Sequence, residues 1–153
     1  MALQRKARLL IIQIGLGLVI VVLTYFLYDS ITAPWEAIQR DLQLTVDTRS
    51  HMSQVRVALR RYYEVNSRFP HSLDSLETFV AADSIINLNP DSMFGGSFDA
   101  SLFLTSARSG AMFEYSVNDT SRVKIYLLKD PDSDDAIGSA EPDITELHAS
   151  TWE

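Results

Sequence analysis

The sequence contains no cysteine. A disulfide framework, a thiolate zinc site and a cysteine nucleophile are therefore all excluded. The 125 residues that follow Tyr28 are enough for one domain with its own core and too few for two ordinary domains. Such a domain has to be stabilised by packing, by a membrane, by neighbouring subunits or by a bound cation.

Recognisable catalytic motifs are also missing. The three histidines, His51, His71 and His148, fall in different segments of the chain. There is no Gly-x-Ser-x-Gly elbow and no His-Glu-x-x-His pair, and Gly95-Gly96 lacks the sequence context of a phosphate-binding loop. We therefore predict that the protein is not an enzyme.

Basic residues are scarce over most of the chain. After Tyr28 there are 10 Lys and Arg against 20 Asp and Glu, a formal charge of −10. The last 24 residues contain eight acids and no Lys or Arg. A surface of this charge repels phosphate backbones, so we expect no nucleic-acid partner.

The N-terminal segment does contain basic residues, followed by a long apolar run. Arg5, Lys6 and Arg8 precede an uncharged stretch from residue 9 to residue 28. At a rise of about 1.5 Å per residue this stretch spans roughly 30 Å, the thickness of the hydrocarbon core of a bilayer. The pattern predicts a cytoplasmic start at residues 1–8, a transmembrane helix at residues 9–28 and a domain outside the cytoplasm at residues 29–153.

A cleaved signal peptide is the alternative interpretation of this start. The apolar run is longer than a signal peptide requires. Cleavage after Thr32-Ala33 would also leave Pro34 as the next residue, which makes a poor processing site. We therefore expect an uncleaved single-pass anchor.

A second helical pattern follows the anchor. Large apolar residues recur mostly at three- and four-residue spacing, which predicts a long amphipathic helix; they are Trp35, Ile38, Leu42, Met52, Val55, Leu59 and Tyr62. The helix should end at Asn66-Ser67 because Pro70 disfavours helical geometry just before it. Ser72 can then cap a short second helix with Leu73, Leu76, Phe79 and Val80 on one side.

The next part of the chain has the pattern of a loop and three strands. Turn signals occur at Asn89-Pro90-Asp91 and Gly95-Gly96. Strands are expected at Ser101–Ser106, Met112–Val117 and Val123–Leu128, and their short separations favour an antiparallel meander. We expect an α+β fold. The helix should bury Leu59 and Tyr62 against Phe113, Tyr115 or Tyr126, while Glu114 faces solvent.

Three sequence motifs carry a resemblance to a known family. Residues 58 to 76 read ALRRYYEVNSRFPHSLDSL, residues 89 to 96 read NPDSMFGG, and residues 126 to 145 read YLLKDPDSDDAIGSAEPDIT. In this order they resemble type IV pilins and, more closely, the major pseudopilins of type II secretion systems. The resemblance implies a transmembrane helix that continues into a long helix packed on a small antiparallel sheet. It also implies a bacterial inner-membrane protein with a periplasmic C-terminal domain ending in an acidic loop at residues 130–153.

One departure from that family leaves two functions open. Counted without a gap from Phe69-Pro70, Pro34 matches the usual kinking proline, but Ile12 stands at the prepilin peptidase Gly and Gly17 at the Glu that helps subunits to register. The first function is a structural subunit that packs against copies of itself or other pilin-like subunits. The alternative is a non-polymerising, membrane-tethered periplasmic binding module of pilin-like fold.

The acidic C-terminal segment is the candidate metal site. Asp130, Asp132 and Asp134 alternate, and Glu141 follows at the spacing of a calcium loop. Asp135 stands where an EF-hand requires Gly, which argues against that motif. The pseudopilin resemblance independently implies calcium, with a backbone oxygen from Leu128 and side chains from Asp134, Glu141 and Asp143. A solvated acidic tail is the alternative.

Overall fold

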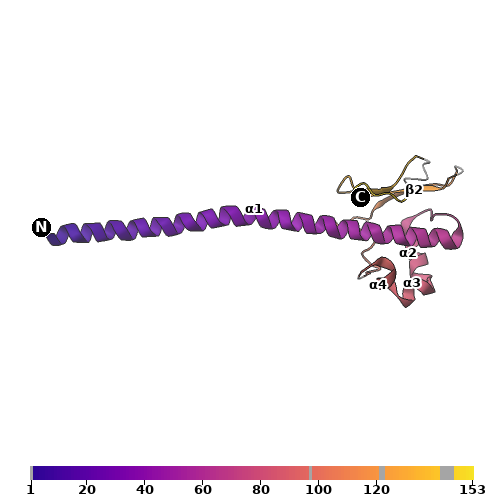
Figure 1. Ribbon diagram of the computed structural model, residues 1–153, viewed down its shortest axis with the longest axis horizontal. Helices are drawn as coiled ribbons and strands as arrows, with labels where there is room; N and C mark the ends of the chain where they lie inside the picture. The colour runs from indigo at the N-terminus through magenta and orange to yellow at the C-terminus, as the bar shows by residue number, and fades with distance from the viewer. Residues whose placement is uncertain (1, 97, 121–122, 142–146) are drawn as a thin grey trace. The chain divides into compact units, whose positions relative to one another are not determined.

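The computed structural model describes residues 2–96, 98–120, 123–141 and 147–153, without the side chains of residues 2–9, 11, 33 and 34 (Figure 1). The chain divides into two compact units, Met1–Leu42 and Gln43–Glu153. The first helix, α1, runs from Ala2 to Asn66 and contributes to both units. The fold is α+β, as the sequence predicts.

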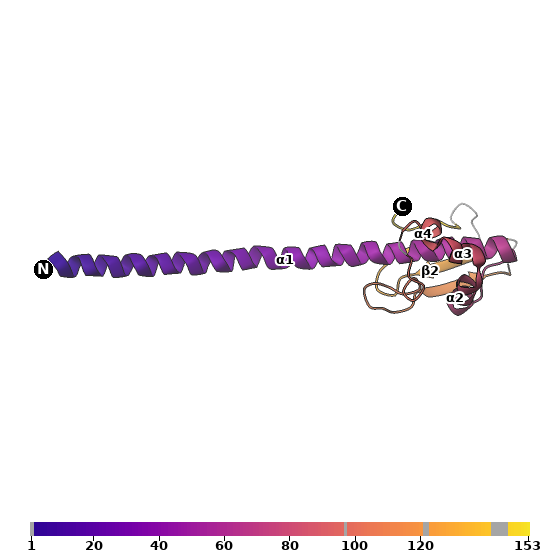
Figure 2. The ribbon, with the colours of Figure 1, turned by 90° about the horizontal axis from the view of Figure 1, so that it is seen from below.

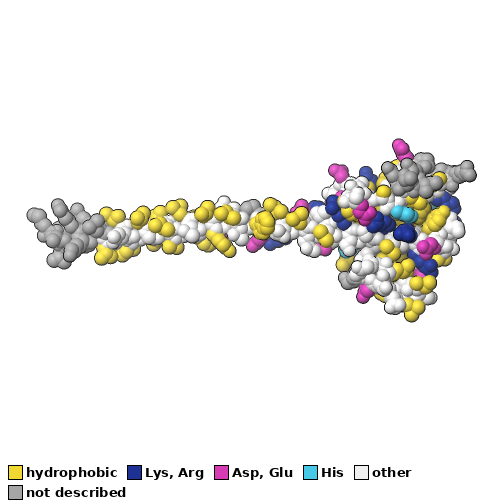
Figure 3. Space-filling model, viewed as in Figure 1, with side chains coloured by type: hydrophobic (Ala, Val, Ile, Leu, Met, Phe, Trp, Pro, Cys, Tyr) yellow, Lys and Arg dark blue, Asp and Glu magenta, His cyan; other side chains and the backbone are white. Residues whose placement is uncertain are grey.

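The first unit consists of the N-terminal part of α1. From Leu10 to Tyr28 the large apolar side chains that the structure describes are between 43% and 69% exposed, so none of them is covered by the described residues of the second unit. Figure 3 shows hydrophobic side chains along this stretch. Among the described residues there is one helix long and apolar enough to cross a membrane, with a mean hydropathy of 2.0 over its most apolar window.

In the second unit, α1 buries the face that its apolar spacing predicts. Met52, Val55 and Leu59 are fully buried. The helix ends at Asn66, as expected, and the backbone turns at Ser67, whose φ is 54°. The N–H of Ser67 donates to the carbonyl of Tyr63 at 2.8 Å and closes the last turn.

The predicted second helix is confirmed, and two short helices follow it. Helix α2 spans Leu73–Ala82, and the Ser72 hydroxyl caps it by accepting from the N–H of Ser75. Helices α3, Ser84–Leu88, and α4, Pro90–Phe94, occupy the segment where we expected a loop. The reason is local: Asp83 accepts from two backbone N–H groups of α3, and a proline is tolerated in the first turn of a helix.

The sheet has three antiparallel strands in the order β1-β2-β3, but one of them is not a predicted strand. Strand β1 is Glu114–Asn118, β2 is Ile125–Lys129 and β3 is Ala136–Gly138. Tyr115 pairs with Leu128, which in turn pairs with Ile137. The predicted strand at Ser101–Ser106 is wrong, apart from a single bridge between Thr105 and Met112.

A carboxylate explains why that segment turns. Asp99 accepts from both the N–H and the hydroxyl of Ser101, and its carbonyl accepts from the N–H groups of Leu102 and Phe103. These local bonds replace the ladder bonds that a strand would make. The third strand of the sheet comes instead from the acidic segment, through β3.

The core of the second unit lies where α1 meets the sheet and α2. Figure 1 shows β2 on one side of α1 with α3 and α4 on the other, and Figure 2 shows β2 following the direction of α1. Leu59 is fully buried in one apolar cluster with Phe113 and Tyr126, which confirms its predicted burial in the core. Tyr62 is only half-buried, with its ring edge-on to Phe79 at 4.9 Å between centroids. Glu114 is exposed, as expected.

Candidate functional site

The candidate site is the loop between β2 and β3, which contains four of the eight C-terminal acids. The loop closes with a backbone hydrogen bond from Asp130 to the carbonyl of Asp135, at 2.9 Å. It is therefore an ordered connection between two strands over Asp130–Asp135 rather than a solvated tail.

Asp130 is the most unusual of the loop acids because it is only 3% exposed. Its Oδ2 accepts from the hydroxyl of Ser133 at 2.7 Å. Its Oδ1 is buried and has no hydrogen-bond partner among the described residues. A buried carboxylate oxygen without a partner is costly, and a cation or an ordered water would remove that cost.

The other predicted ligands are dispersed. Asp132 accepts from the hydroxyl of Ser109, a bond that holds the pKa of this carboxyl below its usual value. Asp134 and Glu141 are exposed, and Leu128 is a buried residue of the β2–β3 ladder. Asp143 lies outside the described residues.

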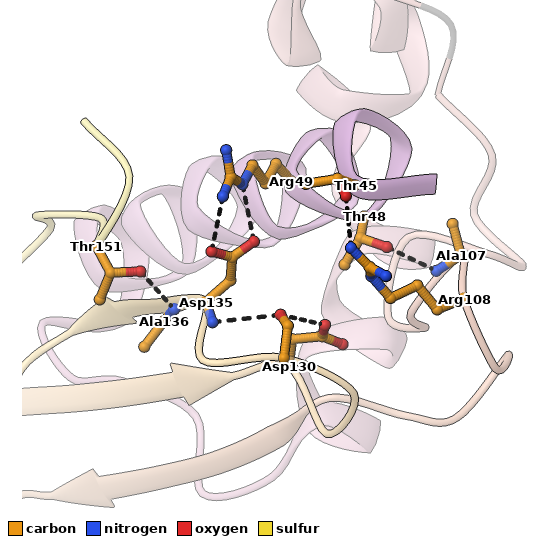
Figure 4. A network of polar contacts seen from close by, with 10 residues as sticks. Thr45, Thr48, Arg49, Ala107, Arg108, Asp130, Asp135, Ala136 and Thr151 are labelled. Carbon is orange, nitrogen blue, oxygen red and sulfur yellow. Dashed lines mark hydrogen bonds and ion pairs between the residues drawn. The ribbon is translucent and has the colours of Figure 1, made fainter. Parts of the chain in front are cut away.

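Asp135, which the sequence analysis did not select as a ligand, anchors the loop to α1. Its two carboxylate oxygens accept from Nε and Nη2 of Arg49 at 2.8 and 3.0 Å (Figure 4). The Arg49 guanidinium also lies 5.3 Å from the ring centroid of Trp152. A two-point Arg–carboxylate pair fixes orientation as well as distance, so this contact sets where the loop sits on the helix.

The turn beside the loop is fastened to the same stretch of α1. The guanidinium of Arg108 donates to the hydroxyl of Thr45, and the N–H of Ala107 donates to the hydroxyl of Thr48 at 3.2 Å (Figure 4). Thr48 is buried. Residues 45–50 of α1 are polar except for Val46. Through Thr45, Thr48 and Arg49 this stretch contacts both the β2–β3 loop and the turn at residues 107–108.

The C-terminal segment Leu147–Glu153 completes this region by lying along β3. The N–H of Gly138 donates to the carbonyl of Ala149 at 2.9 Å, and the N–H of Thr151 donates to the carbonyl of Ala136 at 3.0 Å. Arg56 of α1 binds both oxygens of Glu153, at 3.0 Å each. The segment is thus held by the sheet and by α1.

These contacts hold the acidic side chains of the region at separate positions. Within residues 2–96, 98–120, 123–141 and 147–153, no three Asp, Glu or His side chains lie close enough together to hold a metal ion. The described residues include two buried side-chain oxygens without a hydrogen-bond partner, Oδ1 of Asp130 in the loop and Oγ of Ser150 in the C-terminal segment. Comparison of the chain with protein-family models, with curated proteins and with solved structures gave no match.

Proposed function

We propose that the protein is a pseudopilin-like structural subunit of a type II secretion or type IV pilus-like assembly. In this proposal residues 9–28 cross a bacterial inner membrane and residues 29–153 lie in the periplasm. The motifs quoted above and the α+β fold built on a long N-terminal helix support it. Its partners are the lipid bilayer and other copies of the chain.

The observation that carries the proposal is an apolar stripe on α1 beyond the expected membrane span. Trp35, Ile38, Leu42 and Val46 are 62%, 53%, 54% and 61% exposed. Their spacing puts all four on one face of the helix. Lipid covers apolar residues only within the span, so a stripe outside it requires contact with other protein. Packing between copies supplies that contact without any further component, whereas the tethered binding module requires a different partner protein at the stripe.

A photo-crosslinking side chain at Ile38 tests the assembly in membranes. If copies pack through the stripe, each copy can be joined to a neighbour on either side, and illumination should give a ladder of multimers. Ala37 is also exposed but lies about 100° further round the helix, so the same probe there should give little product. A single adduct of unrelated mass at Ile38 would support the tethered binding module instead.

The state of the N-terminus is a second test. Because Ile12 and Gly17 replace the residues that a prepilin peptidase substrate carries, we expect the anchor to stay uncut. The intact mass of protein extracted from membranes should equal that of the chain from the first residue of the sequence. A chain beginning near Gln13 would show processing and would contradict this prediction while strengthening the proposed assembly.

We further propose that the β2–β3 loop binds one calcium ion that stabilises the domain. Asp130 is the ligand that the structure favours, because its Oδ1 is buried without a partner among the described residues. A hard cation takes six to eight oxygens, so the exposed side chains of Asp134 and Glu141 would have to move toward Asp130 on binding. The ion would offset the repulsion among carboxylates in this segment and would take no part in chemistry.

Thermal unfolding with and without calcium tests this site. At free calcium about 100 times the dissociation constant, the folded state should gain roughly 2.7 kcal/mol, seen as a higher melting temperature. Asp130→Asn should remove that gain because it removes the charged ligand. Glu77→Gln, on the exposed side of α2, should keep it. Equal melting temperatures in millimolar calcium and in excess chelator would contradict calcium binding. The partner of the buried Asp130 oxygen would then be an ordered water.

A further inference from the structure

The C-terminal segment Leu147–Glu153, here called the strap, covers a sheet edge that would otherwise be open. Strand β3 is an edge strand of the sheet. Ser150 forms a bridge with Ile137, and the strap supplies backbone partners to Ala136 and Gly138. An uncovered edge presents unpaired N–H and C=O groups to any extended chain. The strap therefore controls access to this edge.

One titratable residue of the strap lies in its contact with the core. Nδ1 of His148 is 2.9 Å from the hydroxyl of Tyr126, a fully buried residue of β2. The ring of Phe69 lies 6.5 Å from the imidazole, between centroids. Nη1 of Arg56 donates to the carbonyl of His148 at 3.2 Å. His148 is half-buried, so a charge on its ring would be only partly solvated.

The charged groups facing His148 from the described part of the chain oppose a positive charge on it. Arg56 and the exposed Arg60, both on α1, act on it through their positive charges, and Glu153 of the strap already binds Arg56. Burial, followed by the charges of Arg60 and Arg56, lowers the pKa of His148 below its usual value. Burial also raises the pKa of Tyr126, so its hydroxyl keeps its proton and can donate to a neutral imidazole.

We propose that the strap is an acid-released latch: protonation of His148 detaches Leu147–Glu153 from β3 and opens that edge of the sheet. Protonated Nδ1 is a donor only, so in the docked strap the Tyr126 hydroxyl has to act as the acceptor. The new cation also stands beside Arg56 and Arg60 in a poorly solvated position. Release moves the imidazolium into water and away from Arg56 and Arg60, so the charge is better solvated and less repelled.

The direction of the pH dependence follows from linkage. The pKa of His148 is lower in the docked strap than in the released strap, so the released strap binds the proton more tightly. Docking is complete above the ordinary histidine pKa of about 6.5 and weakens as the pH falls below it. The Arg56–Glu153 pair acts in the same direction but further into acid, because the bond from Arg56 lowers the pKa of Glu153.

Two measurements on the full chain in detergent or vesicles test the latch. Amide exchange, corrected for the pH dependence of its intrinsic rate, should show loss of protection at Gly138 and Thr151 between about pH 7.5 and about pH 5.5, either side of the histidine pKa. The amide of Val55, in the buried face of α1, should stay protected. In a Trp35→Phe background, Trp152 is the one remaining tryptophan, and its emission should shift to the red over the same range.

Two variants separate the latch from general acid unfolding. His148→Gln keeps a polar group but cannot take up a proton in this range, so its strap should stay docked at both pH values. Arg60→Gln removes a charge that lowers the pKa of His148 in the docked strap, so the docked and released pKa values come closer together and release should move to lower pH. Unchanged protection in the wild type, the same pH response in His148→Gln, or simultaneous loss of protection at Val55 would each overturn the proposal.

Discussion

Leu59→Ala should lower the free energy of unfolding by about 2–5 kcal/mol, the cost of removing a large aliphatic side chain from a packed core. Leu59 is fully buried and belongs to one cluster with Phe113, Tyr126 and Leu128. The cavity would therefore open between α1 and the sheet, where neither element can move without breaking its other contacts. Chemical denaturation of the detergent-solubilised chain, followed by Trp152 fluorescence in a Trp35→Phe background, measures the effect.

Val65→Ala is the matched control on the same helix. Val65 is 52% exposed, so its truncation should change the free energy of unfolding by less than about 0.5 kcal/mol. If the two variants lost the same small amount, the contact between α1 and the sheet would not be the core of this unit.

Gly138→Ala should destabilise the fold by a similar amount for a different reason. Gly138 has a φ of 89°, and a Cβ at this position would lie 2.2 Å from the carbonyl oxygen of Tyr126. The positive φ costs about 1–2 kcal/mol for an alanine, and the crowding against the backbone adds about 1–3 kcal/mol. The same denaturation assay measures the sum.

Gly110→Ala separates the two contributions. Gly110 has a φ of 72°, but a Cβ added there would meet open space, with no neighbouring atom within 4 Å, so only the conformational cost applies. We expect a loss of about 1–2 kcal/mol there. If Gly138→Ala cost no more than Gly110→Ala, the close approach of β3 to β2 at Tyr126 would be flexible enough to absorb a methyl group.

Local patterns predicted α1 and α2 of the second unit, although not the short helices α3 and α4. The apolar spacing of α1, the cap at Ser72 and the stop before Pro70 all act within a few residues, so the sequence shows them directly. The buried position of Leu59 followed from the same spacing. Strands β1 and β2 were placed within a few residues because their apolar character is local too.

The position of the acidic segment could not be predicted from the sequence because it depends on long-range contacts. Arg49 and Asp135 are separated by 86 residues, and neither belongs to a motif that points to the other. Their pairing holds the acidic segment against α1, where three residues of that segment form β3. The predicted ligand set assumed that acids close in sequence converge on one point. In the structure Asp130 points into a buried site, while Asp132 and Asp135 bind side chains on other elements.

The pairing of Arg56 with Glu153, across 97 residues, also has a consequence for biosynthesis. Ribosomes add about 5–20 residues per second, so several seconds separate the synthesis of these two residues. During that interval α2 is available to pack against the apolar face of Met52, Val55 and Leu59, but the strap is not yet complete. The Arg56–Glu153 pair can form only after residue 153 has been synthesised, so the strap docks late in the folding of this unit.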